Sequence, residues 1–165
     1  MVTGEDDAAR AIVPRLKAVD ADLTRIKILE YPCLDLFLSS APLVVEAQRI
    51  PDCKLIIIDP VTAFMGACNQ NDNSEVRRVM RGLGDVAVKT NTAIVLVTHL
   101  SKKIELGVKL RVLGSVGFAA AARSVWVVFQ KPEDADTRLP SPVRPSGSMG
   151  RGFTKHGNRS RGSGC

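Results

Sequence analysis

The chain has 165 residues, a hydrophobic fraction of 45% and a formal net charge of +6 at pH 7. This length suits one domain with a hydrophobic core, and no apolar run reaches the ~18 residues that a membrane span needs. The start is acidic and lacks a signal-peptide pattern. The four cysteines form no C-x-x-C pair and only two histidines accompany them, which disfavours zinc and predicts reduced thiols in the cytoplasm.

The positive charge is concentrated near the end of the chain. Residues 1–136 hold 17 basic and 17 acidic residues, whereas residues 137–165 hold six basic residues and no acidic one. Pro, Gly, Ser and Arg dominate from about Pro140, which predicts a disordered basic tail over 140–165 after a domain over 1–139. A basic tail argues for nucleic-acid binding less than a basic face on a folded domain does.

The chain opens with the pattern of a strand followed by a helix. Residues 1–4 resemble the end of a strand, and Asp6 or Asp7 is positioned to cap a helix that runs to about Ala18. Pro14 either kinks this helix or begins its second segment. The next expected elements are a short strand over 25–29 and a helix over 42–48, led by Ser39 or Ser40.

Two strongly apolar runs flank the clearest helix of the chain. Residues 54–59 read Lys-Leu-Ile-Ile-Ile-Asp, a run apolar on both faces that predicts a strand buried in a parallel sheet. Asp72 and Glu75 have capping-box spacing at the start of a helix that Asn91 is suited to end. Residues 93–97 form a second apolar run, predicted to be a fully buried strand, and it leads into Thr98 and His99.

The alternation of strands and helices defines the fold class. A small-residue helix over 115–122 and a strand over 124–130 follow a polar, basic loop. Alternating elements predict parallel βαβ units, an α/β fold and a three-layer sandwich. We expect residues 54–59, 93–98 and 124–130 to lie in one parallel sheet.

Three chemically useful side chains stand at predicted strand ends: Glu5, Asp59 and His99. Parallel strands bring their carboxyl ends to one edge, where open α/β sheets bind ligands, so these side chains are expected to converge. Each also has a simpler interpretation. Glu5 could be a helix cap, Asp59 with the following proline could begin a turn, and His99 could be structural.

In their order and spacing, a series of short motifs resembles the RecA-like ATPases of bacteria and phages related to the plasmid replicative helicase RepA, usually catalogued as AAA-family ATPases. The resemblance covers about residues 1–139, although no single motif is decisive. The matching segments are Gly4–Asp7, Pro14–Leu16, Leu55–Phe64, Asn71–Arg77, Val97–Lys102, Gly114–Ser115 with Phe118, Ala120–Trp126 and Pro132–Asp134.

The resemblance implies a partial RecA-like P-loop NTPase core with ATP and Mg²⁺ as cofactors. Glu5 would be the catalytic carboxylate that orients or deprotonates the attacking water, and Asp59, the Walker B position, would hold Mg²⁺ through water. His99 would sense the γ-phosphate, and Ser115 would be among the nucleotide-binding residues. Arg123 would be an arginine finger for a neighbouring subunit, unless it only pairs with a carboxylate at the sheet edge.

The resemblance also implies partners. The family assembles into homo-oligomeric rings, with a hexamer expected, and acts on single-stranded nucleic acid without a membrane. The loops at 65–74 and 101–113 would face nucleic acid in the channel, unless they are only solvated basic loops. Their phosphate contacts would come from Lys102, Lys103, Lys109 and Arg111.

The sequence departs from the family in one important respect. It contains no G-x-x-x-x-G-K-[ST] phosphate loop, which in the family precedes the strand ending at Gly4 and Glu5. We therefore expect an inactive fragment, with an unpaired strand edge at Ile94–Val97 where the first strand of the family lies. The alternative function is a non-catalytic nucleic-acid-binding or interaction module that uses the basic tail.

Overall fold

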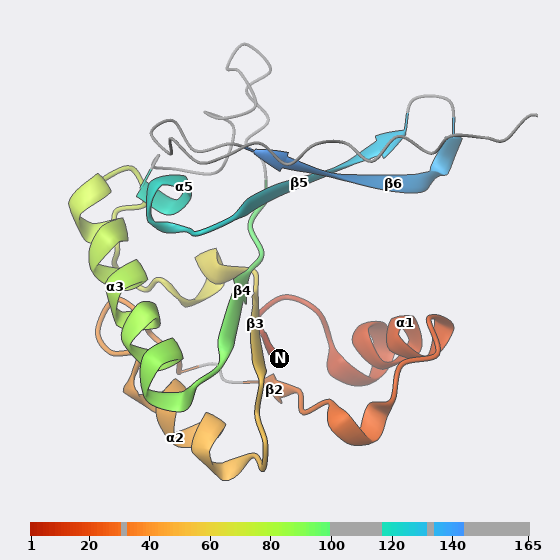
Figure 1. The fold of residues 1–165 in the computed structure, drawn as a ribbon, viewed down its shortest axis with the longest axis horizontal. Helices are drawn as coiled ribbons and strands as arrows, with labels where there is room; N and C mark the ends of the chain where they lie inside the picture. Colours follow the sequence, from red (N-terminus) through yellow and green to blue (C-terminus); the bar gives the residue numbers. More distant parts are fainter. Residues whose placement is uncertain (31–32, 100–116, 132–133, 144–165) are drawn as a thin grey trace, which may run out of the picture.

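A four-stranded parallel sheet forms the centre of the molecule. The computed structural model describes residues 1–30, 33–99, 117–131 and 134–143. Within them the strand order is β2-β1-β3-β4, and every neighbouring pair is parallel. The strands are β1 (Val2–Thr3), β2 (Leu29–Glu30), β3 (Leu55–Asp59) and β4 (Ala93–Leu96). Figure 1 shows that helices flank this sheet on both sides, as expected for an α/β fold.

The two longer strands of this sheet are covered better on one face than on the other. Ile56 and Ile58 of β3 are 6% and 0% exposed, whereas Leu55 on the other face is 47% exposed. In β4, Val95 is 46% exposed and its neighbours are half-buried. The prediction of strands at these positions is confirmed, but the prediction of full burial is wrong. Consecutive apolar residues show that a strand can be covered on both faces, not that both faces are covered.

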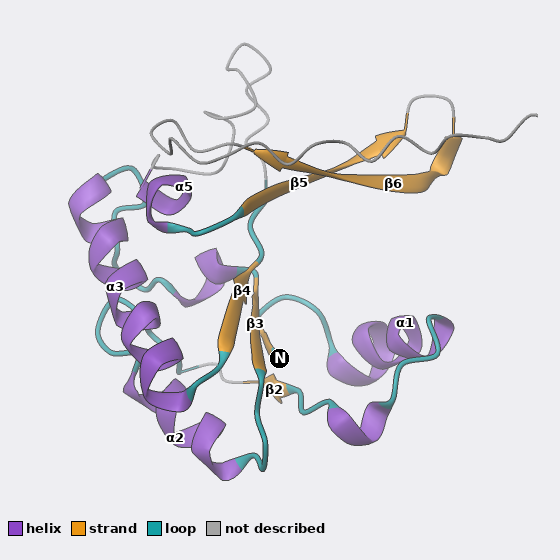
Figure 2. Ribbon diagram, in the orientation of Figure 1, coloured by secondary structure: helices purple, strands orange, loops and turns teal. Residues whose placement is uncertain are grey.

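The largest helices pack together on one side of the sheet (Figure 2). They are α2 (Ala41–Arg49) and α3 (Asn73–Thr90). On the other side lie η1 (Ala8–Ile12), which has π-helical geometry, and α1 (Val13–Ala18). A helix to Ala18 was expected, and Pro14 lies in the first turn of its second segment, which begins at Val13. Within the described residues, no helix is long and apolar enough to cross a membrane.

The ends of α3 follow the predicted capping chemistry. The Asp72 carboxylate accepts hydrogen bonds from the backbone N–H groups of Ser74 (2.7 Å) and Glu75 (3.3 Å). At the other end Asn91 adopts the left-handed conformation, with φ 52° and ψ 43°. Asparagine tolerates this conformation better than most residues, so it ends the helix and turns the chain into β4.

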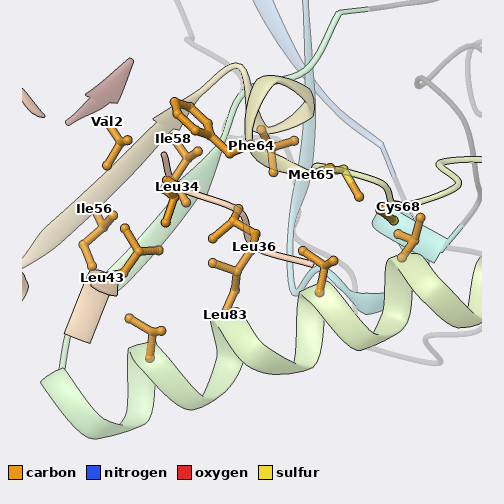
Figure 3. Close-up of a cluster of buried hydrophobic side chains, with 14 of the residues drawn as sticks. Val2, Leu34, Leu36, Leu43, Ile56, Ile58, Phe64, Met65, Cys68 and Leu83 are labelled. Atoms are coloured by element: carbon orange, nitrogen blue, oxygen red, sulfur yellow. The ribbon is translucent and has the colours of Figure 1, made fainter. Parts of the chain in front are cut away.

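One hydrophobic cluster joins the sheet to α2 and α3. Figure 3 shows Ile58 of β3 and Leu83 of α3 among its members, with Phe64 and Met65 from the segment after β3. That segment includes the 3-10 helix η3 (Val61–Phe64). Ile58, Val61, Met65 and Val76 are all 0% exposed. The packing of this cluster fixes β3, and therefore Asp59 at its end, relative to α3.

The last described strands differ from the prediction. β5 (Val125–Lys131) pairs antiparallel with β6 (Asp134–Val143) in a separate two-stranded sheet. The prediction that residues 124–130 join the main parallel sheet is therefore wrong. An apolar run predicts a strand but not its partner, and the nearest segment in sequence pairs antiparallel through a short connection.

The first residues of the expected unstructured tail belong to a strand. Residues 140–143 belong to β6, although Pro140 and Pro142 suggested the contrary. A proline is tolerated in an edge strand, and β6 has a partner on one side only. Residues 144–165 lie outside the described part of the chain.

The strand predicted over 25–29 is shorter than expected. Residues Leu23–Arg25 form a 3-10 turn, η2, and only Leu29 and Glu30 are in β2. The Asp22 carboxylate accepts a hydrogen bond from the backbone N–H of Thr24 at 3.0 Å. This local hydrogen bond from side chain to backbone favours a turn over an extended strand.

Candidate functional site

Three neighbouring parallel strands bring Glu5, Asp59 and His99 to one edge of the sheet. The register pairs Thr3 of β1 with Asp59 of β3, and Ile58 of β3 with Leu96 of β4. Hydrogen bonds continue beyond the strands: the Gly4 N–H donates to the Asp59 carbonyl at 3.2 Å. The predicted convergence at the carboxyl ends is therefore present.

Gly4 allows the end of β1 to lie against η3. A Cβ atom at Gly4 would be 2.8 Å from the Ala63 Cβ and 3.0 Å from the Phe64 ring. Real Cβ contacts are longer than 2.8 Å, so a larger residue would move β1 away from η3. Glycine at this position thus keeps Glu5 beside the end of β3.

Glu5 contacts His99 directly. The His99 Nε2 lies 3.4 Å from the Glu5 Oε2, and the two side chains are 63% and 58% exposed. An ion pair this exposed contributes little to stability, so stability alone does not explain the arrangement. Glu5 is also not the helix cap considered above, because the Asp7 carboxylate accepts the hydrogen bond from the Arg10 N–H at 2.6 Å.

Asp59 lies in a locally acidic environment. Partial burial raises the pKa of Asp59, and the nearby carboxylates of Asp6 and Glu5 raise it further. His99 and Arg15 oppose this shift, and Arg15 is itself paired with Asp6 at 2.6 Å. A carboxylate in such surroundings is stabilised by an added cation, because the cation favours the charged form.

Thr98, between β4 and His99, contains an unpartnered polar atom. Its Oγ1 is buried and has no hydrogen-bond partner among the described residues. A buried hydroxyl without a partner is unfavourable, so this atom is available to a bound polar group. From the sequence, Thr98 was expected only to follow the strand over 93–97, and Asp6 was not expected to pair with Arg15. All three lie in the segments that carried the resemblance, so a signal was present.

The site offers carboxylate oxygens, which are ligands that Mg²⁺ prefers. Magnesium is usually held by one or two carboxylates together with water and substrate phosphates, and Asp59 and Glu5 provide such oxygens. In the part of the chain that the structure describes, no group of three or more His, Cys, Asp or Glu side chains is arranged to hold a metal. These residues therefore fit a magnesium ion that is bound mainly through water and nucleotide, and not a preformed protein cage.

The remaining residues predicted to be functional are not part of this edge as predicted, or they lie outside the described residues. Arg123, expected to reach a neighbouring subunit, is exposed and follows α5 (Gly117–Ala121), which packs against α3. The expected loop 65–74 is tied to the start of α3, since the Glu75 carboxylate accepts the Asn69 N–H at 2.6 Å. The residues outside the described part are Ser115, Lys102, Lys103, Lys109 and Arg111.

The fold is that of an open α/β domain, a class that binds its ligands outside the carboxyl ends of the strands, where Glu5, Asp59 and His99 lie. A family described as AAA domain matches residues 1–105. Because this match covers more than half of the chain, the protein belongs to that family, an AAA-type P-loop family. Membership implies an ATPase-type domain that binds nucleotide, typically with Mg²⁺. A comparison with curated proteins gives no match.

Proposed function

We propose that this chain carries the catalytic edge of a RecA-like, replicative-helicase-like ATPase that acts on single-stranded nucleic acid. The observation that supports this most is the convergence of Glu5, Asp59 and His99, with Glu5 and His99 3.4 Å apart. In P-loop ATPases the work of the protein is to position water and to stabilise charge, and these side chains suit both tasks.

Glu5 is the residue that orients or deprotonates the attacking water. Its carboxylate is more than half exposed, so it can reach a water at the sheet edge. His99 holds this carboxylate from one side, and the N–H of a neutral or charged imidazole can donate to Glu5. His99 also directly precedes residues 100–116. Through its contact with Glu5, His99 can therefore pass a change at the nucleotide on to that segment.

Asp59 orients the water shell of the magnesium ion. Bound Mg-ATP supplies the phosphoryl group together with the cation that neutralises developing negative charge. Asp59 is half-buried beside two other carboxylates, and when ionised it would accept hydrogen bonds from the water around a bound Mg²⁺. The unpartnered Thr98 Oγ1 is a further donor at this edge.

The need for a phosphate loop is tested by adding such a loop to the chain. Residues 1–165 contain no G-x-x-x-x-G-K-[ST] sequence, so we expect the chain to bind Mg-ATP weakly or not at all in calorimetry. Micromolar binding that is lost in Asp59→Ala would contradict this expectation. A segment with a phosphate loop, taken from a relative and joined ahead of Met1, should produce ATP hydrolysis.

Within that chimera the assigned roles give distinct results. Glu5→Gln should abolish turnover and leave ATP bound, because it removes the base and not the phosphate anchor. Asp59→Ala should weaken the binding of Mg-nucleotide itself. Glu46→Gln is the matched control, because Glu46 lies on α2 and pairs with Arg49 away from the site. Unchanged turnover in Glu5→Gln would refute the assignment of Glu5.

Nucleic acid and ring assembly form the second part of the proposal. Single-stranded DNA should stimulate hydrolysis by the chimera, through Lys102, Lys103, Lys109 and Arg111. Arg123 acts as an arginine finger across subunits of a hexameric ring. Arg123→Ala should therefore reduce activity only in the assembled state, as rings of mixed subunits would show. An equal loss of activity in monomeric Arg123→Ala and in the assembled ring would contradict this role.

The basic residues near the end of the chain support a second candidate function, a nucleic-acid-binding module without catalysis. Residues 137–165 contain six basic residues and no acidic one. Fluorescence anisotropy with labelled single-stranded DNA separates the two candidates. Salt-sensitive binding that disappears when residues 144–165 are deleted favours the module, whereas binding that depends on Lys102 and Lys103 favours the ATPase.

A further inference from the structure

The outer side of α3 carries a row of exposed residues that points away from the hydrophobic cluster. Arg77, Arg81, Gly84 and Val88 follow one another at intervals of four, three and four residues, so they form one line along the helix. All four are exposed, and Val88 is 84% exposed. The buried residues of the helix, such as Leu83, lie on the opposite side. Figure 2 shows α3 at the periphery of the molecule, so this row faces solvent.

The two guanidinium groups of this row have no counter-charge. Within the described residues, Arg77 and Arg81 form no hydrogen bond or ion pair, and Asp85, one turn after Arg81, is not paired with it either. Arg78, in contrast, is used inside the domain. It donates to the Phe37 carbonyl at 2.8 Å and lies 4.3 Å from the centre of the Phe37 ring. Like charges one turn apart repel each other, so an anion bound between them is favourable.

Gly84 points to the close approach of another backbone. It lies inside an 18-residue helix, where glycine is among the least favourable residues. A Cβ atom at Gly84 would meet no other atom within 4 Å, so the domain itself leaves room for a side chain there. At Gly82 the fold does limit the side chain, because a Cβ atom would be 3.1 Å from the Ser40 Oγ. The absence of a side chain at Gly84 therefore serves a contact outside the domain.

The position of the row favours nucleic acid as the partner. α3 begins at Asn73, whose side chain accepts the Gly117 N–H at 3.1 Å. Gly117 directly follows residues 100–116, which contain the basic residues proposed above to contact nucleic acid. Arg77 lies one turn beyond Asn73, so the row continues from the point where that segment rejoins the domain. A nucleic-acid strand carries regularly spaced negative charges and can use positive groups that follow one another along a surface.

We propose that Arg77 and Arg81 bind neighbouring phosphate groups of a single nucleic-acid strand that runs along α3, and that Gly84 lets this strand approach the helix. The inference rests on the proposed action on single-stranded nucleic acid. Arginine suits this contact, because its planar guanidinium can donate two parallel N–H···O hydrogen bonds to one phosphate. Side chains four residues apart on a helix have Cβ atoms about 5–6 Å apart, so both arginines reach the same strand.

The test is fluorescence anisotropy of the full 165-residue chain with a labelled oligothymidylate of about 20 nucleotides, at several salt concentrations. Arg77→Ala/Arg81→Ala should raise the dissociation constant about tenfold at low salt. It should also reduce the slope of log affinity against log salt by about 1.4, because each phosphate contact on a single strand contributes about 0.7. The matched control is Arg10→Ala/Lys17→Ala, which removes the same charge from the other side of the sheet and should change neither quantity.

A variant of Gly84 separates binding from stability. Gly84→Leu should raise the melting temperature by about 2–4 °C, because leucine is a much better helix former than glycine. The same variant should weaken binding of the oligothymidylate about threefold or more, because its side chain keeps the strand away from the helix. A change that only affected folding would not move stability and binding in opposite directions. Unchanged binding in Gly84→Leu would refute the close approach.

The other outcomes separate this inference from the proposed function. Binding that persists in Arg77→Ala/Arg81→Ala but is lost when Lys102 and Lys103 are replaced would refute the inference alone. An unmodified chain that binds no oligothymidylate would contradict both the inference and the proposed action on nucleic acid. Polyglutamate is the comparison for an acidic protein partner. If it bound as tightly as the oligothymidylate, and only through the two arginines, an acidic protein would be the partner and the nucleic-acid contact would be overturned.

Discussion

Replacing Ile58 by alanine tests whether the packing of β3 is one-sided. The variant removes three carbon atoms from a side chain that is 0% exposed. At about 0.8 kcal/mol per buried methylene this loses roughly 2.4 kcal/mol, and the cavity raises the cost to about 3–4 kcal/mol. Leu55→Ala removes the same number of carbons from the same strand. Leu55 is 47% exposed, so we expect a loss of only about 1 kcal/mol.

Urea denaturation followed by circular dichroism measures both free energies of unfolding. The midpoint for Ile58→Ala should fall at least about 1 M further than that for Leu55→Ala, given typical slopes for domains of this size. Equal losses in the two variants would mean that both faces of β3 are covered in solution. That result would refute one-sided packing of β3.

Three further predictions concern individual side chains. Because the pKa of Asp59 is raised above its ordinary value of 3.8, the native protein gains protons relative to the unfolded chain, and its stability falls as pH rises through that window. Asp59→Asn should therefore melt at a higher temperature than the unmodified chain at pH 7, and not at pH 3. For Asp72 the hydrogen bonds from Ser74 lower the pKa, so its contribution is present above pH 3.8 and is lost as pH falls through the lowered value. Asp72→Ala should be destabilising at pH 7, with a penalty that shrinks in acid; a penalty independent of pH would contradict the role of the ionised cap. Gly4→Ala should cost about 1–3 kcal/mol through overpacking, and Ala63→Gly should partly restore it in thermal melts of the double variant.

The main strands and the best-capped helix could be predicted because local signals agree there. The apolar run that ends at Asp59 is typical of a strand and of no other regular element. It pairs with a second run of the same kind, at residues 93–97. The capping positions Asp72 and Asn91 mark the ends of α3 through their own side-chain and backbone chemistry. The site followed from these elements, since parallel strands place Glu5, Asp59 and His99 at one edge.

The remaining features depend on contacts that a local pattern does not contain. The partner of β5 is β6, and nothing in residues 125–131 distinguishes this pairing from a place in the main sheet. The Asp6–Arg15 pair forms only because η1 and α1 turn the chain back towards β1. Partial burial at Asp59 likewise depends on how much of the sheet face is covered, which no residue of β3 specifies by itself.

The two attachments around residues 100–116 have an evolutionary consequence. His99 follows β4 at the sheet edge, and the Gly117 N–H donates to the Asn73 side chain at the start of α3, at 3.1 Å. The segment between them therefore begins and ends at positions that are fixed by separate elements. The entropy of closing a connection grows slowly with its length, by only about 0.6 kcal/mol for each doubling. Insertions and deletions can therefore accumulate between His99 and Gly117 while the geometry of the sheet edge is retained.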